Sequence, residues 1–147
     1  MQGNRYTNET AKITYTSSEE AKIAHDFIGV YKGLKRVQEF NNQSMMKDLH
    51  AENDRGNTEY KYLLSNTTQD RIIKLSTQMK FRLQEGSGEA FYIIGVHDNG
   101  EAVGITPEEM ELSLRILHKM AACISAKLYI RSVRKGCKGE VVKIRVI

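Results

Sequence analysis

The residues with the most chemical potential lie in one short stretch, Gly95–Thr106, which reads GVHDNGEAVGIT. A His97-Asp98 pair could serve a hydrolase as base and orienting acid, and the glycines could approach a phosphate. Neighbouring residues on a strand point to opposite faces, so this pair is not expected to form a catalytic hydrogen bond. Asn99-Gly100 is a strong hairpin signal, because both central residues of a type I′ turn need a positive φ. We therefore predict a backbone turn at this stretch and no catalytic residue in the chain.

Other catalytic signatures are missing from the sequence. It has no G-x-S-x-G elbow of a serine hydrolase and no G-x-x-x-x-G-K-[ST] phosphate loop of an NTPase. The glycines of GSGEAF, residues 86–91, follow a predicted helix and precede a predicted strand, which is the wrong order for a phosphate site at a helix N-terminus. No metal site is expected, because the histidines His25, His50, His97 and His118 are scattered along the sequence.

Composition places the chain among small proteins without a membrane segment. Its 147 residues fit one domain with an extension, and the formal net charge of +4 with a pI near 9.0 leans towards an acidic partner such as RNA. No apolar run approaches the roughly 20 residues that span a bilayer, and the N-terminus lacks an apolar signal core. A cytoplasmic location is expected, in which Cys123 and Cys137 stay free thiols.

The region 58–147 is predicted to form an α+β domain. Turn residues, apolar periodicity and helix-capping pairs predict strands, helices and their order. The predicted elements are a strand at Glu59–Ser65, a helix at 67–85, strands at Ala90–Val96 and Glu101–Ile105, a helix that starts at Thr106-Pro107, and strands at Lys127–Val133 and Glu140–Ile147. The order β-α-β-β-α-β-β is typical of a ferredoxin-like, split βαβ sandwich of two layers, with one sheet face left open.

The region 1–57 is predicted to hold a polar N-terminus, an amphipathic helix and a linker. Ser17 and Glu20 form a capping-box pair at the start of the helix. An apolar row follows at spacings of three and four residues, comprising Ile23, Phe27, Val30, Leu34 and Val37. Such a row fits a helix docked on its own domain, or a helix that pairs with another chain or domain. The polar segment 41–57 is interpreted as a linker with one helical turn around Met45–Leu49, which places the domain boundary before residue 58.

A basic cluster near the C-terminus is the feature of the sequence that most strongly suggests a function. Its members are Lys127, Arg131, Arg134, Lys135, Lys138, Lys143 and Arg145, and Glu140 is the acid among them. Such cations could contact RNA phosphates without sequence preference. The alternative is a solvated rim that keeps an edge strand from aggregating.

Several of these residues also carry a family resemblance. In order and spacing the chain resembles the domain ahead of the GTPase domain in the GTP-binding protein 1 and 2 family, relatives of elongation factor 1 alpha, on residues Gly86-Ser87-Gly88-Glu89, Tyr92-Ile93-Ile94-Gly95, Asp98, Gly100, Gly104-Ile105, Met110 and Ser113. The resemblance covers about Glu59–Ile147, and EVVKIRVI falls where the family enters its GTPase domain. It implies a parent protein that hydrolyses GTP, binds aminoacyl-tRNA and acts at the ribosome or in RNA turnover.

Three functions follow as hypotheses. The first is a non-catalytic accessory domain that contacts RNA, the ribosome or the GTPase domain of the same polypeptide. GTP and magnesium are then expected only in that GTPase domain, and this chain is read as its N-terminal fragment, with no cofactor of its own. The second is a nucleic-acid-binding module of the Schlafen or Alba-like type, which the GVHDNGEAVGI hairpin faintly resembles. The third is a protein-protein interaction module that uses the apolar row of the N-terminal helix.

Overall fold

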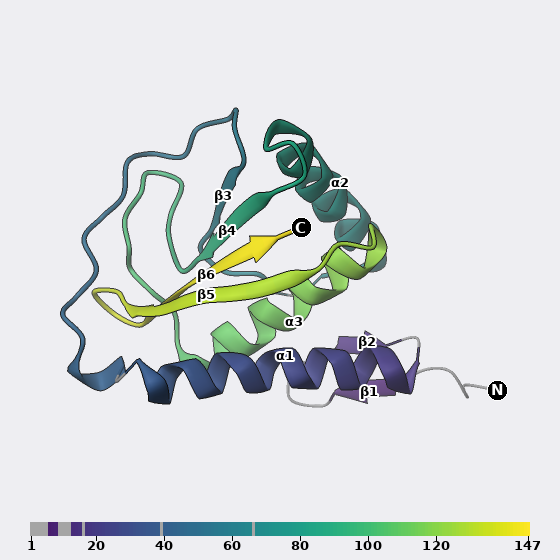
Figure 1. Ribbon diagram of the computed structural model, residues 1–147, viewed down its shortest axis with the longest axis horizontal. Helices are drawn as coiled ribbons and strands as arrows, with labels where there is room; N and C mark the ends of the chain where they lie inside the picture. The colour runs from purple at the N-terminus through teal and green to yellow at the C-terminus, as the bar shows by residue number, and fades with distance from the viewer. Residues whose placement is uncertain (1–5, 9–12, 16, 39, 66) are drawn as a thin grey trace.

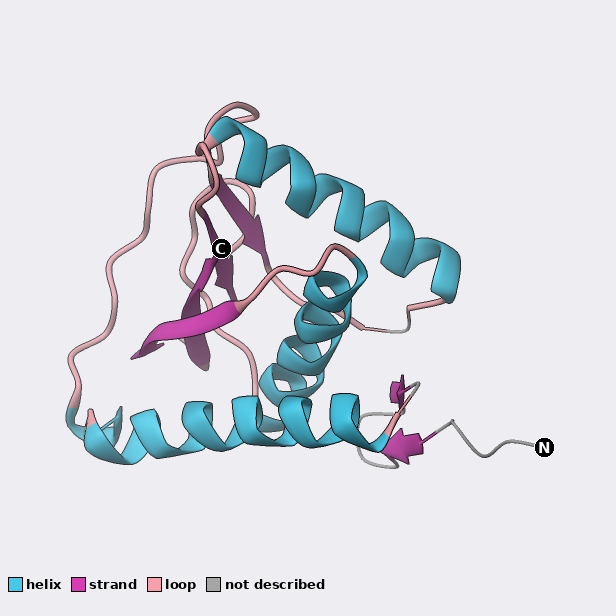
Figure 2. Ribbon diagram, turned by 45° about the vertical axis from the view of Figure 1, so that its right-hand side comes forward, coloured by secondary structure: helices cyan, strands magenta, loops and turns pink. Residues whose placement is uncertain are grey.

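The computed structural model describes residues 6–8, 13–15, 17–38, 40–65 and 67–147. A four-stranded sheet lies at the centre, with helices α2 (Gln69–Glu85) and α3 (Pro107–Cys123) on one of its faces (Figures 1 and 2). The long helix α1 (Ser18–Val37) runs below the sheet, beside α3 and the outer strand (Figure 2). Two short strands, β1 (Tyr6–Asn8) and β2 (Ile13–Tyr15), pair antiparallel beside the start of α1.

The central sheet is mixed and has the strand order β3-β4-β6-β5. Strand β3 (Thr58–Lys61) pairs parallel to β4 (Ala90–Ile94), and α2 is the crossover between them. Strand β6 (Glu140–Val146) pairs antiparallel to both β4 and β5 (Leu128–Lys135). The predicted strands 59–65, 90–96, 127–133 and 140–147 are thus present with shifted ends, and the predicted α+β class is confirmed.

The ferredoxin-like order is not found, because the expected strand Glu101–Ile105 does not form. The order along the sheet region is β-α-β-α-β-β. Only isolated bridges occur in this segment, from Ala102 to Val96 and from Ile105 to Glu140. Gly104 has a φ of +87°, which interrupts an extended backbone after three residues. The segment therefore crosses from β4 to α3 as a loop that touches the sheet at two points.

The predicted type I′ turn at Asn99-Gly100 is also wrong by one residue. The Gly100 N–H donates to the His97 carbonyl at 2.8 Å, so Asp98 and Asn99 are the central residues. Neither has a positive φ, whereas Gly100 has a φ of +95°. This combination is the alternative hairpin geometry, a turn with ordinary φ values followed by a glycine that bulges.

Gly104 is required by close packing as well as by its φ. A Cβ on Gly104 would lie 2.3 Å from the carbonyl carbon and oxygen of Gly139, in the turn between β5 and β6. Gly104 thus allows close backbone contact between two loops.

Gly104→Ala is expected to lower the free energy of unfolding by about 1–3 kcal/mol, because it adds a clash to a strained φ. Urea denaturation followed by circular dichroism measures the loss. Gly88→Ala is the matched control, since Gly88 has a φ of +101° but open space around it. Equal losses in the two variants would contradict the role of close packing.

Helix starts follow the predicted capping residues. The Thr68 hydroxyl accepts the Arg71 N–H, and Thr106 with Glu109 forms a complete capping box with Pro107 in the first turn. Apolar residues at helical spacing are predicted to face the core in both helices. Most of them are buried, namely Ile72, Leu75, Met79, Met110, Leu114, Leu117 and Ala121, whereas Leu83 and Ile124 are partly buried.

Helix α1 is docked on the domain, but the face of the helix that is buried differs from the predicted apolar row. The Ser17 hydroxyl accepts the Glu20 N–H, as the capping pair predicts. The buried side chains of the helix are Ala24, Phe27, Ile28 and Tyr31, and they join the hydrophobic core that α2, α3 and the sheet share. Of the predicted row, Phe27 is buried, Leu34 is partly buried, and Ile23, Val30 and Val37 are exposed.

The segment interpreted as a linker is an ordered strap across the sheet, defined here as residues 44–57. The helical turn expected at Met45–Leu49 is absent, and a 3₁₀ turn lies earlier, at Phe40–Asn42. Backbone N–H groups of the strap donate to carbonyls of the domain: Met46 to Lys135, Leu49 to Gly100 and Glu52 to Asp98. These bonds satisfy the backbone polar groups of a segment that, from the sequence alone, is predicted to be exposed to solvent.

Candidate nucleic-acid interface

The two faces of the sheet differ in chemistry because β6 alternates. Val142, Ile144 and Val146 are buried under the helices, whereas Lys143 is exposed and Arg145 is partly exposed on the other face. In Figure 2 helices α2 and α3 lie on one side of the sheet, and the strap and the loop after β4 lie on the other. The second face is therefore the one that a partner could reach.

The strap covers only part of that second face. A small apolar cluster forms there from Tyr60, Ile93, Val96, Ala102 and Val141, with Met46 and Leu49 of the strap packed against it. The remaining surface is called the open strip and is defined by Phe91, Tyr129, Arg131, Lys143 and Arg145. It combines aromatic rings and cations on one face of three adjacent strands.

Contacts within the open strip hold its side chains in place. The Lys143 ammonium lies 4.8 Å from the centre of the Phe91 ring. Arg145 Nε donates to Glu89 Oε2 at 2.5 Å, so its charge is balanced by a neighbour. Tyr129 keeps 48% of its surface exposed, and Arg131 is exposed where the β5–β6 register shifts between Ile130 and Ser132. Within the described part of the chain, Lys143 and Arg131 are thus the cations of the strip that form no ion pair.

The seven cations predicted as an RNA site spread over both strands and their turn. Arg131, Lys143 and Arg145 belong to the open strip, whereas Arg134, Lys135 and Lys138 lie at the far end of β5 and in the turn that follows. Lys127 lies before β5, where its backbone exchanges two hydrogen bonds with Ile147. Since β5 has eight residues at about 3.3 Å each, the cations extend over roughly 26 Å.

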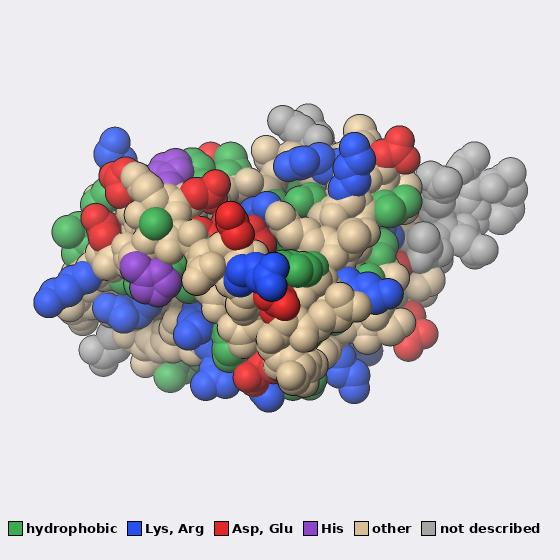
Figure 3. All heavy atoms as spheres, turned by 90° about the horizontal axis from the view of Figure 1, so that it is seen from above, with side chains coloured by type: hydrophobic (Ala, Val, Ile, Leu, Met, Phe, Trp, Pro, Cys, Tyr) green, Lys and Arg blue, Asp and Glu red, His purple; other side chains and the backbone are tan. Residues whose placement is uncertain are grey.

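Charge is distributed unevenly along the chain. Residues 127–147 hold seven of the 22 Lys and Arg residues but one of the 18 Asp and Glu residues, so the other 126 residues are net acidic. Seen from above, acidic and basic side chains are intermixed on the molecule (Figure 3). A polyanion is therefore favoured at the last two strands over the rest of the described surface.

The single acid among those cations does not weaken the positive field outside. Glu140 is 2% exposed and accepts a hydrogen bond from the Tyr31 hydroxyl. Its second oxygen accepts from Lys35 Nζ at 2.5 Å. Burial and the Glu140 carboxylate raise the pKa of the Tyr31 hydroxyl, which keeps it protonated as the donor. This buried trio joins α1 to the start of β6.

A second buried ion pair anchors the strap to α2. Arg82 Nε donates to Glu59 Oε1 at 2.8 Å, and its other nitrogens donate to the carbonyls of Asn53, Arg55 and Gly56. Arg82 and Glu59 are 3% and 4% exposed. Desolvation raises the pKa of the neighbouring Glu52, and the Glu59 carboxylate raises it further, although the Tyr60 backbone N–H that Glu52 accepts opposes this.

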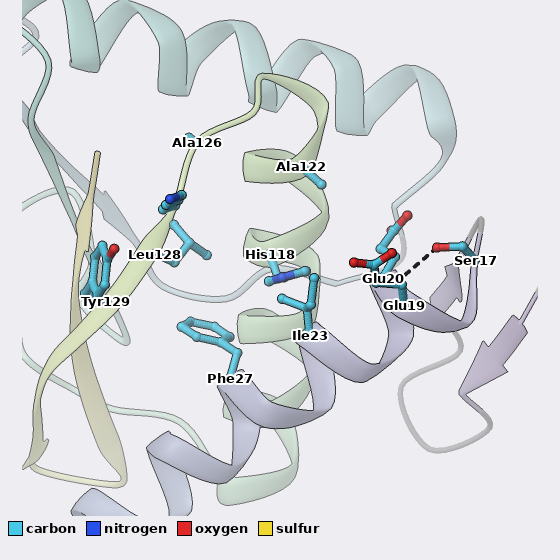
Figure 4. A pocket seen from close by; sticks show the side chains of 11 residues that line it. Ser17, Glu19, Glu20, Ile23, Phe27, His118, Ala122, Ala126, Leu128 and Tyr129 are labelled. Atoms are coloured by element: carbon cyan, nitrogen blue, oxygen red, sulfur yellow. Dashed lines mark hydrogen bonds between the residues drawn. The ribbon is translucent and has the colours of Figure 1, made fainter.

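An apolar groove of about 570 Å³ lies between α1, the end of α3 and the start of β5. Ile23 and Phe27 of α1 point into it beside His118 of α3 (Figure 4). The rings of Phe27 and His118 lie 5.9 Å apart, and desolvation lowers the pKa of His118. Of the predicted partner face, Ile23 and Phe27 thus line this groove, while Val30, Leu34 and Val37 are not among its lining residues.

Comparison with known proteins gives the chain its relatives. It is 51% identical over 87 residues to GTP-binding protein 2 of mouse and of human, and 28% identical over 81 residues to GTP-binding protein 1 of Xenopus laevis. The chain is homologous to GTP-binding proteins 1 and 2. The family resemblance predicted from the sequence is thereby confirmed. The matched parts are 59% and 55% of this chain, and the chain spans only 14% and 12% of the length of those relatives.

The remaining comparisons yield nothing further. No family model matches the chain, and no solved structure matches it. Among the described residues, no group of three or more His, Cys, Asp or Glu side chains could hold a metal ion. No helix within the described ranges combines the length and the apolar character of a membrane span.

The helix starts of this chain do not fit a nucleotide phosphate. Ser17, Thr68 and Thr106 already cap the three α-helices, and each first turn carries acids. Carboxylates such as Glu108 and Glu109 repel an anion at the positive end of the helix dipole. We derive no step through GTP from this chain.

The stretch around His97 also has a structural use. The His97 ring stacks on Tyr62 with centroids 4.1 Å apart, and the Asp98 carbonyl accepts the Glu52 N–H of the strap. These contacts tie the turn to β3 and to the strap. Because His97 and Asp98 are engaged in these contacts, the open strip remains as the surface with the chemistry of a binding site.

A search of the sequence for basic residues does not find Phe91 and Tyr129. They come from two strands and meet only through the register of the sheet. The alternation of Val142, Ile144 and Val146 with Lys143 and Arg145 marks β6 as having a solvent face. Had the partner strands been known, that signal would have led to both rings.

Proposed function

We propose that this chain is a non-catalytic accessory domain of a GTP-binding translation factor, and that it contacts RNA, in tRNA or in the ribosome, through the open strip. One observation carries the proposal. A sheet face not covered by helices presents Lys143 and Arg131 beside the exposed Tyr129 ring and the partly exposed Phe91 ring, at the strands that hold most of the excess positive charge. Single-stranded RNA is commonly bound on such faces of four-stranded sheets.

The homology supports a GTPase as the parent protein. GTP and magnesium would be bound by its GTPase domain, and the parent would act in translation in the cytoplasm. This chain would contribute affinity or orientation for RNA and no step of hydrolysis. The basic strands would hold phosphates without sequence preference, so the domain would add binding energy to many RNA sequences.

Salt-dependent binding tests this function. The 147-residue chain is titrated against a fluorescent single-stranded oligouridine at several salt concentrations. We expect the logarithm of the binding constant to fall linearly with the logarithm of salt, by about 0.7 for each phosphate contact. No binding at low salt would overturn the proposal.

A protein partner is the second candidate, favoured by the apolar groove and by the exposed Ile23, Val30 and Val37. The partner would be the GTPase domain of the same polypeptide or another chain. If the groove binds a protein, Ile23→Lys should leave the affinity for oligouridine in that titration unchanged. In a separate binding measurement it should lower the affinity of the chain for a purified GTPase domain.

A further inference from the structure

Two aromatic side chains flank one arginine in a single row of the sheet. Arg145 of β6 lies opposite Phe91 of β4 on one side and opposite Tyr129 of β5 on the other. Directly paired residues share a face, so the three side chains stand side by side on the open face. Two strand spacings separate the rings, a distance of roughly 9.6 Å.

Cations lie in the next row, beside these rings. Lys143 lies two positions before Arg145 on β6, and its ammonium lies against the Phe91 ring. The shift in register between Ile130 and Ser132 leaves Arg131 as the extra residue of β5 near Lys143. The Lys143 ammonium covers the Phe91 ring face, and a flexible lysine can leave this face for a phosphate, so that the face becomes available to a base.

The geometry favours unpaired bases over a duplex. Aromatic rings bind a base by stacking on its flat face, which a paired and stacked base does not offer. The strap covers the neighbouring part of the face through Met46 and Leu49, so the accessible row is short. Duplex RNA needs contacts across successive grooves, for which this row has no length.

We infer that the row Phe91–Arg145–Tyr129 binds two unpaired bases of an RNA strand by stacking, one on each ring, while Lys143 and Arg131 take the adjoining phosphates. This inference rests on the proposed function and gives it a ligand class. Arg145, held by Glu89, spaces the two bases and offers its guanidinium plane between them.

The stacking is tested with a reporter that the chain allows. The sequence contains no Trp, so Tyr129→Trp introduces a single indole into the row. Single-stranded oligouridine is expected to quench its fluorescence, whereas inorganic polyphosphate, which has charges but no bases, leaves the emission unchanged. Equal quenching by both polymers would contradict stacking.

Affinity is measured with ring-deletion variants. Phe91→Leu and Tyr129→Leu are each expected to weaken binding of single-stranded oligouridine about tenfold or more, and to leave binding of an RNA duplex unchanged. Phe81→Leu is the control, because Phe81 is a similarly exposed ring on α2, at 39% exposure. Circular dichroism and thermal unfolding establish that each variant is folded.

The outcomes separate this inference from the proposed function. If the ring variants bind oligouridine as the unaltered chain does, stacking is wrong while RNA contact through cations stands. If the unaltered chain binds no RNA at low salt, both are wrong. Losses confined to single-stranded RNA support both.

Discussion

Arg82→Ala is expected to lower the free energy of unfolding by about 3–5 kcal/mol, the largest effect on stability that the structure predicts. The change removes the nearest cation of the buried Glu59 carboxylate, which keeps only the Lys61 ammonium at 3.8 Å, and it leaves three strap carbonyls without their Arg82 donors. The strap should detach from α2 and expose the small cluster around Tyr60. Urea denaturation followed by circular dichroism measures the loss.

Arg71→Ala is the matched control on the same helix. Arg71 is exposed, so its removal should change stability by no more than about 0.5 kcal/mol. Arg82→Lys should recover only part of the loss, since one ammonium cannot replace a guanidinium that bonds a carboxylate and three carbonyls. A loss below about 1 kcal/mol in Arg82→Ala would mean that the strap is held by other contacts.

The triple variant Arg131→Ala, Arg134→Ala and Lys143→Ala removes two cations of the open strip and Arg134, the next cation along β5. It is expected to lose about 100-fold in affinity for single-stranded RNA at 0.1 M salt. Each lost phosphate contact removes about 0.7 from the salt slope, which is about a factor of five at this concentration. The salt slope should therefore fall by about two. Fluorescence anisotropy of labelled oligouridine over a series of salt concentrations gives both quantities.

A control with the same change in net charge separates local contact from general attraction. Arg71, Lys74 and Lys80 are exposed on α2, on the helical side of the sheet. Replacing these three by Ala should weaken binding by less than about tenfold. If both triple variants lose affinity equally, RNA is attracted by net charge and the open strip is not its site.

Much of the region 58–147 could be predicted because its signals are local. A threonine cap and apolar residues at helical spacing define α2 and α3 without tertiary information, and in α3 an acid lies three residues after the cap. The strand at Glu101–Ile105 fails because apolar alternation cannot tell whether a neighbour is available for pairing. There the loop meets Val96 and Glu140 at single bridges only.

Helix α1 shows where periodicity alone is insufficient. Two apolar rows run along it and share Phe27; the predicted row includes Ile23 and Val30, and the buried row includes Ala24 and Tyr31. The choice between them depends on the distant Glu140, whose carboxylate accepts a hydrogen bond from the Tyr31 hydroxyl. No local pattern carries that information.

The strap and the open strip also depend on distant contacts. Residues 44–57 are polar, so they resemble a linker, yet Arg82 binds their carbonyls from α2. The basic residues of the strip could be found by composition, whereas Phe91 and Tyr129 need the register of three strands. Whether residue 58 begins a separate domain stays a prediction.

Mapping the RNA-binding surface tests the central claim most directly. The ¹⁵N-labelled chain is titrated with single-stranded oligouridine and followed by amide chemical shifts. The account predicts that shifts concentrate at Phe91 and Lys143, together with Tyr129, which also lines the groove, and that they spare the exposed positions of α2. Shifts confined to the groove around Ile23 and His118, or no shifts at saturating RNA, would contradict it.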